Sequence, residues 1–116
     1  MTVNFVYKIF RPSEWASLKS HGVFYGSEHD KRDGFIHLST ASQLAGTLAK
    51  YYTDGQAVIL AEILCDDFLD AIKFEPSRDG ELFPHLYDVL LRARIKRHWL
   101  LQARKDASYE LPNLLV

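Results

Sequence analysis

The segment from Gly34 to Thr40 combines a histidine and two hydroxyls with apolar neighbours. On a strand, alternate side chains share a face, so His37 and Ser39 would lie together. An imidazole can donate and accept hydrogen bonds, as ribose hydroxyls require, and a helix that starts at Ser39 or Thr40 would offer N–H groups to a pyrophosphate. The alternative is a core histidine bonded to a backbone carbonyl, with Ser39 or Thr40 serving only as a helix cap.

A second polar cluster runs from Glu81 to Tyr87, beside Pro84. It contains a carboxylate, a histidine and a phenol, and sites often concentrate on loops of this kind. Glu81 could act as a base or hold a sugar hydroxyl, His85 could take part in catalysis, and Tyr87 could stack on a ring. Equally, the apolar residues of the segment could simply anchor a loop to the core.

Three tyrosines could line a ligand pocket: Tyr25, Tyr51 and Tyr52. A tyrosine ring stacks on nicotinamide or a base while its hydroxyl stays in water. Tyr25 precedes Gly26, whose backbone would let a ligand approach. Adjacent residues on a helix face different directions, so either Tyr51 or Tyr52 is expected to pack in the core.

The motifs of common cofactor and metal sites are absent: the sequence has no Walker-type glycine loop, GxGxxG, CxxC or HExxH. Four histidines lack the tight spacing of metal ligands: His21, His29, His37 and His85. Only the fold could assemble a metal site from them, and we expect none. His29 with Asp30 and Asp33 could in principle hold a cation, but a hydrated loop explains these residues more simply. Cys65 has no evident partner base, so it is not expected to be a nucleophile.

The elements that must position these residues follow from periodicity and caps. We expect helices from the proline at 12 to a cap at Gly22 and from the hydroxyls at 39–40 to residues 53–55, with a loop at 26–34 between them. Strands are expected at 4–10, 23–25, 35–38, 57–64 (a central strand), 71–75 and 90–101, with a loop at 76–84. The sequence predicts one small α+β domain over residues 1–116, with mixed or antiparallel sheets and two helices.

Composition and charge exclude several classes of protein. With 47% hydrophobic residues and a net charge of −1, the 116-residue chain is an ordinary globular sequence. No window is apolar enough for a membrane span and no secretory signal is visible, so we expect a cytoplasmic protein. Residues 92–116 carry 6 Lys/Arg against 2 Asp/Glu, a local sum of +4. That segment could contact RNA, but a solvated edge strand explains it more simply.

The order of these motifs resembles the bacterial domain-of-unknown-function family 952, from about Phe5 to Pro112. The similarity is carried by Gly22–Ser27, by Asp33–Thr40 and by Glu81–Tyr87. That family is grouped by remote similarity with the ADP-ribosyltransferase fold, in which a split pair of small sheets grips NAD. The resemblance implies that His37 is the early strand residue that bonds the ribose. It also implies that Tyr51 or Tyr52 stacks on nicotinamide, and Glu81 is the nearest candidate for the late acidic residue.

Two hypotheses for function follow. The first is an enzyme of the ADP-ribosyltransferase type, with NAD bound by His37 and with Ser39 or Thr40 near the phosphates. The second is a non-catalytic module that binds ADP-ribose, another nucleotide or a phosphorylated metabolite. In both, the partner is a small nucleotide-like molecule and not a membrane. A contact with nucleic acid is the more distant third option, through Arg92, Arg94, Lys96 and Arg97.

Overall fold

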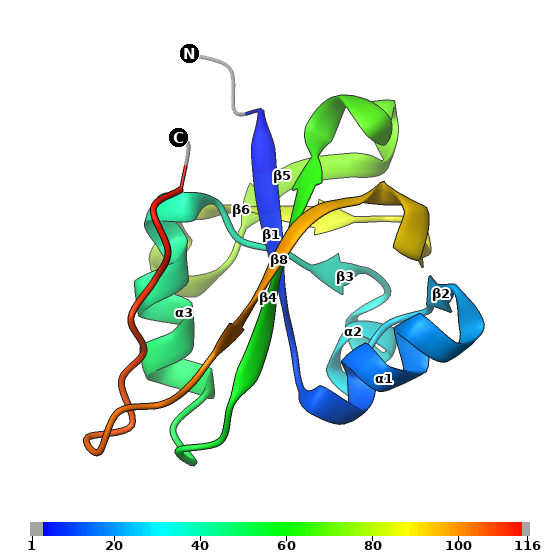
Figure 1. Ribbon diagram of the computed structural model, residues 1–116. Coiled ribbons are helices and arrows are strands. Elements are labelled where there is room, and N and C mark those ends of the chain that lie inside the picture. The colour runs from blue at the N-terminus through cyan, green and yellow to red at the C-terminus, as the bar shows by residue number, and fades with distance from the viewer. Residues whose placement is uncertain (1–3, 115–116) are drawn as a thin grey trace.

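A computed structural model describes residues 4–114 of the chain as a small α+β domain (Figure 1). The α-helices of this part are α1 (Pro12–His21), α2 (Glu28–Asp33) and α3 (Leu44–Tyr51). The strands are β1 (Phe5–Phe10), β2 (Val23–Phe24), β3 (Ile36–His37), β4 (Val58–Leu64), β5 (Ile72–Pro76), β6 (Leu82–Leu86), β7 (Leu90–Leu91) and β8 (Ile95–Leu101). All strand pairs are antiparallel.

The largest sheet has the order β1-β4-β8, with β4 in the middle. Successive residues of β1 and β4 are buried on both faces, as a central strand requires. On one face, Leu44 and Leu48 of α3 pack against Tyr7 and Leu60. The opposite face is covered by α1 and β2, so both faces of the sheet lie in apolar surroundings.

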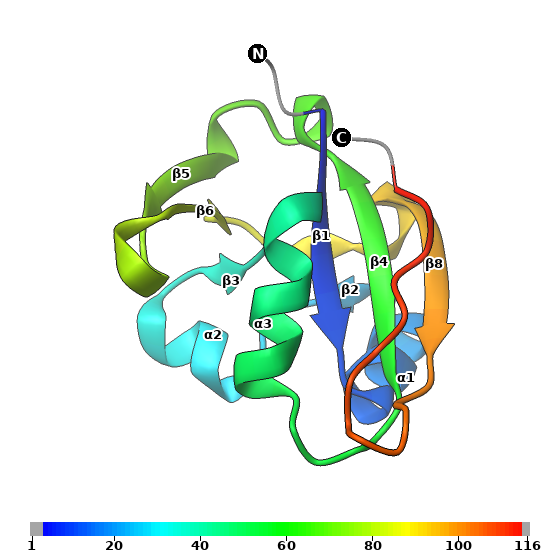
Figure 2. The same ribbon diagram turned by 90° about the vertical axis from the view of Figure 1, so that its left-hand side faces the viewer.

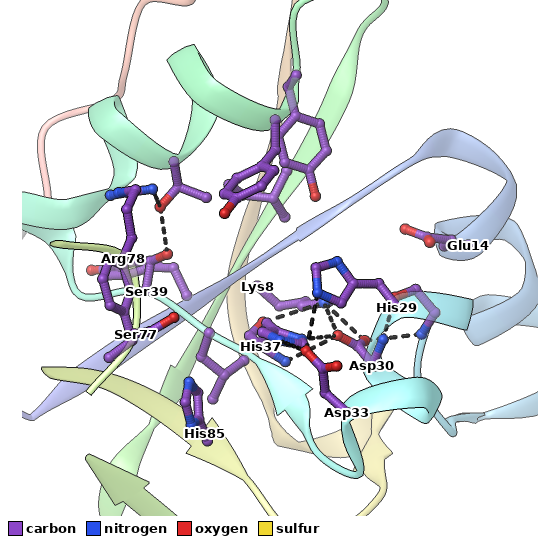
Figure 3. Close-up of a pocket in the computed structure, with 18 of the residues that line it drawn as sticks. Lys8, Glu14, His29, Asp30, Asp33, His37, Ser39, Ser77, Arg78 and His85 are labelled. Carbon is purple, nitrogen blue, oxygen red and sulfur yellow. Dashed lines mark hydrogen bonds and ion pairs between the residues drawn. The ribbon is translucent and has the colours of Figure 1, made fainter. Parts of the chain in front are cut away.

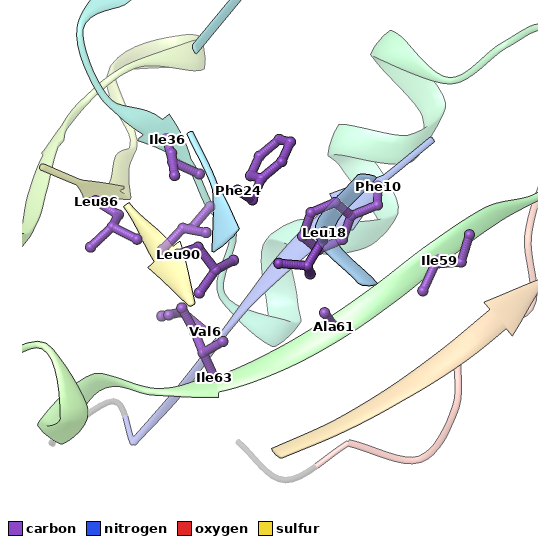
Figure 4. Close-up of a cluster of buried hydrophobic side chains, with 11 residues drawn as sticks. Val6, Phe10, Leu18, Phe24, Ile36, Ile59, Ala61, Ile63, Leu86 and Leu90 are labelled. Atoms are coloured by element: carbon purple, nitrogen blue, oxygen red, sulfur yellow. The ribbon is translucent and has the colours of Figure 1, made fainter. Parts of the chain in front are cut away.

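The cluster on the α1 side of the sheet is drawn in Figure 4. Val6 and Phe10 of β1 meet Leu18 of α1 and Phe24 of β2 there, and the Phe10 and Phe24 rings lie edge to face at 5.0 Å. Figure 4 also shows Ile36 and Leu86 at one end of this cluster, so β3 and β6 belong to the same core. Burial of these side chains therefore fixes the smaller sheets against the larger one.

The second three-stranded sheet has the order β3-β6-β5, and β2 pairs with β7 (Figure 2). The two larger sheets touch through one bridge, in which the N–H groups of Tyr7 and Ser39 each donate to the other residue's carbonyl at 2.8 and 2.9 Å. Beyond that bridge β1 and β3 separate. The edge of β1 is therefore open to side chains from α2 and α3.

Several predicted elements are confirmed. The strand at 4–10, the helix that begins at Pro12 and ends before Gly22, and the strand at 57–64 match β1, α1 and β4. Gly22 adopts φ 77°, the left-handed conformation of a helix C-cap. Between the two hydroxyl candidates, Thr40 rather than Ser39 caps the turn that leads into α3, because its N–H donates to Gln43 Oε1.

The predicted loop at 26–34 was wrong, because it contains α2 as a third α-helix. Ser27 and Asp30 form reciprocal capping bonds at its start, and Gly34 ends it with φ 87°. The helix has only six residues and no apolar stripe, so periodicity gave no signal for it. Its capping pattern, Ser-x-x-Asp, was the available sequence signal.

The predictions of a loop at 76–84 and of one strand at 90–101 were also wrong. The expected loop at 76–84 ends earlier, since Leu82–Leu86 forms the middle strand of its sheet despite Pro84, which cannot donate to the ladder. The carbonyl of Pro84 still accepts a hydrogen bond from the Leu38 N–H at 3.1 Å. The expected strand at 90–101 is divided between β7 and β8 by a 3₁₀ turn at Arg92–Arg94, and its two parts join different sheets.

No helix within residues 4–114 is both long and apolar enough to cross a bilayer. The cytoplasmic location stays a prediction.

A buried carboxylate ties the three strands of the largest sheet together. Glu62 of β4 is 1% exposed, and it accepts hydrogen bonds from the Tyr7 hydroxyl at 2.9 Å and from Arg97 at 2.8 and 2.8 Å. The Arg97 hydrogen bond holds the pKa of the Glu62 carboxyl below its ordinary value, against the opposing effect of burial.

Replacement of this carboxylate, Glu62→Gln, should lower the free energy of unfolding by about 1–3 kcal/mol, because two charge-assisted bonds are lost. The folded-state pKa lies below the ordinary 4.5, so the contribution is complete above that pH and is lost as the pH falls through the folded-state value. Urea unfolding of the wild-type protein and of the Glu62→Gln variant, at several pH values in the acid range, measures this contribution. Glu110→Gln is the control, because Glu110 is 85% exposed. A difference that grows on acidification would contradict the assignment.

Candidate functional site

A pocket of about 420 Å³ straddles the open edge of β1, between α2 and β3 on one side and α3 on the other. Figure 3 shows β1 crossing it, with Arg78, Ser39 and Ser77 at one end and His29, Asp30 and Asp33 at the other. Its lining residues are Tyr7, Lys8, Ile9, Arg11, Glu14, Ser27, His29, Asp30, Asp33, His37, Leu38, Ser39, Thr47, Tyr51, Tyr52, Ser77, Arg78, Phe83 and His85.

A buried ion pair lies at the base of the pocket. The Lys8 ammonium of β1 lies 3.0 Å from Asp30 Oδ2 of α2, and the two residues are 5% and 2% exposed. The same ammonium donates to the His37 carbonyl at 3.2 Å. Lys8 therefore joins β1 to α2 and β3 at the point where the backbone ladder between the sheets has ended.

The Asp30 carboxylate has its oxygens fully occupied. Oδ2 accepts from the Ser27 N–H at 2.9 Å as well as from Lys8, and Oδ1 accepts from the His37 N–H at 3.1 Å. Burial alone raises the pKa of this carboxyl, but the His37 hydrogen bond, the Lys8 charge and the backbone donors outweigh it and hold that pKa well below its ordinary value. Asp30 is therefore an anion that only accepts hydrogen bonds.

The ring of His37 is oriented by this anion. Its Nδ1 lies 2.7 Å from Asp30 Oδ1, and since the carboxylate cannot donate, the proton of this bond belongs to Nδ1. Nε2 points away from Asp30 and lies 2.9 Å from Asp33 Oδ2. The side chain is 29% exposed. Asp30 and Asp33 thus hold the two nitrogens of the ring in place.

The two ends of the short helix α2 add two more polar side chains. His29 and Asp33 are four residues apart on one face of the helix, and His29 Nε2 lies 3.1 Å from Asp33 Oδ2. Desolvation acts to raise the pKa of the Asp33 carboxyl, but the hydrogen bond from His37 and the charges of both imidazoles lower it overall. The prediction of a hydrated loop had missed this convergence, because it requires α2.

His85 of β6 is held in a similar way. It pairs with His37 across β3 and β6, and its Nδ1 lies 2.8 Å from Glu75 Oε1 of β5. Tyr87 donates to the same oxygen at 2.6 Å, and the bonds from Tyr87 and then His85 lower the pKa of the Glu75 carboxyl. The His85 ring is 4% exposed and stacks on Phe35, with ring centroids 3.9 Å apart. Two histidines, each bonded to a carboxylate, therefore reach the pocket.

The opposite end of the pocket is basic and rich in hydroxyls. Arg78 donates to Thr47 Oγ1 at 3.2 Å, and Thr47 in turn bonds Ser39 Oγ at 3.2 Å. Gly46 makes room for the guanidinium, since a Cβ atom there would lie 3.0 Å from Arg78 Nη2. The ion pairs formed among residues 4–114 do not include Arg78. Its charge is therefore available to an anion.

The end of α3 supplies aromatic rings. Tyr51 and Tyr52 both line the pocket, whereas the sequence left open which of them would. Burial raises the pKa of the Tyr52 phenol to about 12, and the Arg11 guanidinium lies over its ring at 4.6 Å. The Tyr51 side chain is half-exposed. Both rings can contact a planar group in the pocket.

Comparison with known proteins decides the family. The profile described as Protein of unknown function (DUF952) matches residues 9–98. The chain belongs to the DUF952 family. Protein CC0527 from Caulobacter crescentus is similar at 38% identity, and its crystal structure superposes with a TM-score of 0.86, covering 91% of this chain and 93% of that chain. Its solution NMR structure gives a TM-score of 0.80 at 39% identity and covers 90% of each chain. No curated protein matches the chain.

The family prediction is therefore confirmed, whereas the likeness to the ADP-ribosyltransferase fold stays a prediction. In this DUF952 chain the structure brings four of the predicted site residues to the pocket: His37, Ser39, Tyr52 and His85. The core-histidine alternative for His37 is partly right, because its ring is anchored to a buried group, but that group is a carboxylate and the side chain is 29% exposed.

Four other predicted site residues do not line the pocket: Tyr25, Thr40, Glu81 and Tyr87. Tyr25 is 66% exposed, and the Thr40 hydroxyl bonds Ser42 at the helix start. Glu81 accepts a hydrogen bond from the Gln43 amide at 3.1 Å. Tyr87 donates to Glu75, the carboxylate that also bonds His85. Glu81 and Tyr87 lie just outside the two ends of β6, whose residues Phe83 and His85 line the pocket.

The residues of the third hypothesis, contact with RNA, are engaged within the fold. Arg97 binds Glu62, Lys96 lies 3.1 Å from Asp67 Oδ2, and Arg92 donates to the Lys19 carbonyl at 3.1 Å. Arg94 lies 4.0 Å from Asp67 Oδ1. These contacts favour the simpler interpretation of a charged edge strand.

Sequence reasoning missed Lys8, Asp30 and Arg78 as parts of the pocket. Lys8 interrupts the apolar strand at 5–10, and a buried position for a lysine implies a partner anion, so this signal was present. The signal for Asp30 was its capping position after Ser27. Arg78 lies in the loop between β5 and β6, and nothing in its spacing indicates that it reaches α3.

Removal of the buried anion, Asp30→Ala, should lower the free energy of unfolding by about 3–5 kcal/mol, because it leaves the Lys8 ammonium buried without a counter-ion. The double variant Lys8→Met/Asp30→Ala should regain part of that loss. Chemical denaturation measures both, with the exposed Asp70→Ala as control. If Asp30→Ala costs no more than Asp70→Ala, the ion pair does not hold α2 in place.

Proposed function

We propose that the pocket binds a small nucleotide-like molecule of the NAD or ADP-ribose type. The observation that carries the proposal is the polarity of the pocket, which has a free guanidinium among hydroxyls at one end and an oriented imidazole at the other. A nucleoside phosphate has the matching polarity, with an anionic group, a sugar diol and a planar ring.

The Arg78 end suits a phosphate. Arginine binds phosphate through a fork of N–H donors, and the hydroxyls of Ser39, Ser77 and Thr47 can supply further hydrogen bonds. This assigns the anion to Arg78 and Ser39, and not to Ser39 and Thr40 as the sequence suggested. The short turn that Thr40 caps, Ala41–Gln43, contributes no residue to the lining of the pocket.

The His37 end suits a sugar. Asp30 at Nδ1 and Asp33 at Nε2 hold the His37 ring in place, so a ribose hydroxyl can bond this polar cluster without further ordering of the ring. The Tyr51 and Tyr52 rings also line the pocket and can stack on a base or on nicotinamide. The cavity of about 420 Å³ falls within the usual size of small-molecule sites, roughly 300–1,000 Å³.

Turnover of NAD by an ADP-ribosyltransferase-like reaction is the second candidate. The observation that favours it is the presence of two histidines, each bonded to a carboxylate, since such pairs can transfer protons. Against it stands Glu81, the acidic residue that the family resemblance implied, because its carboxylate is bonded to Gln43 outside the pocket lining. Binding without reaction is therefore the function that the site supports best.

Loss of the guanidinium, Arg78→Ala, should weaken ADP-ribose binding by roughly 10- to 100-fold, the equivalent of a charge-assisted bond of about 1.5–3 kcal/mol. Thermal shift with NAD, ADP-ribose, nicotinamide and inorganic phosphate measures it, because a ligand that binds only the folded state raises the melting temperature. Arg104→Ala is the matched control, since Arg104 contacts only Ser108 and Glu110 among the described residues.

A second variant, His37→Ala, should also remove the shift with ADP-ribose. If the wild-type protein gives no shift with NAD or ADP-ribose, the proposal fails. Nicotinamide release from NAD, followed in the same samples, separates the two candidates, because a binding module releases none.

A further inference from the structure

We propose that His29, Asp33 and His37 form a binding site for a divalent transition-metal ion, with Zn²⁺ as its typical occupant. The inference rests on the geometry of these three side chains and not on the proposed nucleotide function. It also reverses the prediction of no metal site, which rested on the spacing of the histidines along the chain.

The three potential ligand atoms converge. His29 Nε2 and His37 Nε2 approach the same carboxylate oxygen, Asp33 Oδ2, at 3.1 and 2.9 Å, and all three ligand atoms lie within 4.8 Å of one another. Around a tetrahedral zinc ion with bonds of about 2.0–2.1 Å, ligand atoms lie about 3.3 Å apart. The observed separations therefore need only small side-chain shifts to accept the ion.

The carboxylate behind His37 is the second, independent observation. Metal-bound histidines usually donate their other ring N–H to a carboxylate or carbonyl, which fixes the ring and leaves one nitrogen for the metal. Asp30 makes this contact at 2.7 Å, and its own position is fixed by Ser27 and by the buried Lys8. Asp30 thus holds the His37 ring in place, and a metal ion would replace the contact between His37 Nε2 and Asp33 Oδ2 by a bond to each of these two side chains.

The local charge also favours a cation. Asp30 and Asp33 place two carboxylates near the site, of which only Asp30 is in close contact with a cation, the ammonium of Lys8. Arg32 approaches only the other oxygen of Asp33, Oδ1, at 4.0 Å, so Oδ2 is left to the two imidazoles. Figure 3 shows Asp33 between the His29 and His37 rings, on the side of the pocket opposite Arg78.

The ligand set indicates the class of metal. Two imidazoles and one carboxylate suit Zn²⁺ and its neighbours in the first transition row, whereas Mg²⁺ and Ca²⁺ prefer oxygen ligands. The side chains of His29, Asp33 and His37 are 50%, 36% and 29% exposed, so an ion can enter from the pocket. Three protein ligands leave a coordination position for water or for an oxygen of a bound molecule, as in zinc sites that take part in chemistry.

A metal ion and a sugar hydroxyl would compete for the same nitrogen of His37. His37 Nε2 can bond a sugar hydroxyl or ligate the ion, but not both. An ion bound there would place its open position toward the same cavity whose far end holds Arg78. Metal binding and anion binding therefore use opposite ends and can be tested separately.

The test is isothermal titration calorimetry, in which Zn²⁺ is added to the chelator-treated full-length protein. A parallel run uses Mg²⁺. We expect one ion per chain, and His29→Ala and Asp33→Asn should each weaken Zn²⁺ binding roughly tenfold or more. Both residues lie at the surface end of the site, so these variants keep the buried Lys8–Asp30 pair. His21→Ala is the matched control, because His21 is an exposed helical histidine outside the cluster.

Co²⁺ supplies a spectroscopic readout of the same site, since its visible absorption reports nitrogen and oxygen ligands and should be lost in His29→Ala. Zn²⁺ binding that survives both cluster variants, or that His21→Ala weakens equally, would overturn the site. So would Mg²⁺ binding as tight as Zn²⁺ binding, or no Zn²⁺ binding at all. Arg78→Ala should leave Zn²⁺ binding unchanged, so failure of the metal site and failure of the nucleotide proposal give different results.

Discussion

The buried pair of Lys8 and Asp30 is the interaction on which the pocket depends. It joins β1 to the short helix α2, and the same two side chains bond the backbone and ring of His37 on β3. A charge buried this deeply is tolerated only when its hydrogen bonds are complete, and those of Asp30 are. The pair thus holds open the place where the two larger sheets separate, and the cavity forms there.

The division of the pocket into two chemical ends follows from that constraint. His37 Nδ1 donates to Asp30, which fixes the ring. His37 Nε2, Asp33 and His29 therefore lie together at one end of the pocket. At the other end, Arg78 bonds the Thr47 hydroxyl, lies over the Phe83 ring at 4.8 Å and has Gly46 beside it. One end is suited to a cation or a sugar and the other to an anion. Tyr51 and Tyr52, at the end of α3, add aromatic rings to the lining.

Much of the fold could be predicted from the sequence, and the site less so, for a physical reason. Pro12, Gly22 and the apolar run at 57–64 carry local signals, and the elements they predict are present. α2 is short and polar on all sides, so its existence depends on the Lys8–Asp30 contact, which is non-local. Pro84 argued against a central strand, and Arg78 reaches α3 only through the loop conformation. His37 was predicted from its strand, whereas its partners required the tertiary structure.

The orientation of the His37 ring can be measured directly. Long-range ¹H–¹⁵N correlation spectra of the imidazole side chains report which ring nitrogen carries a proton, and His37→Gln assigns the signal. The bond to Asp30 predicts that Nδ1 of His37 is protonated, and that Asp30→Asn releases the ring to exchange between tautomers. A wild-type His37 with its proton on Nε2 alone would contradict the account, because Nδ1 would then have no proton to donate to Asp30 and Asp30 would not orient the ring.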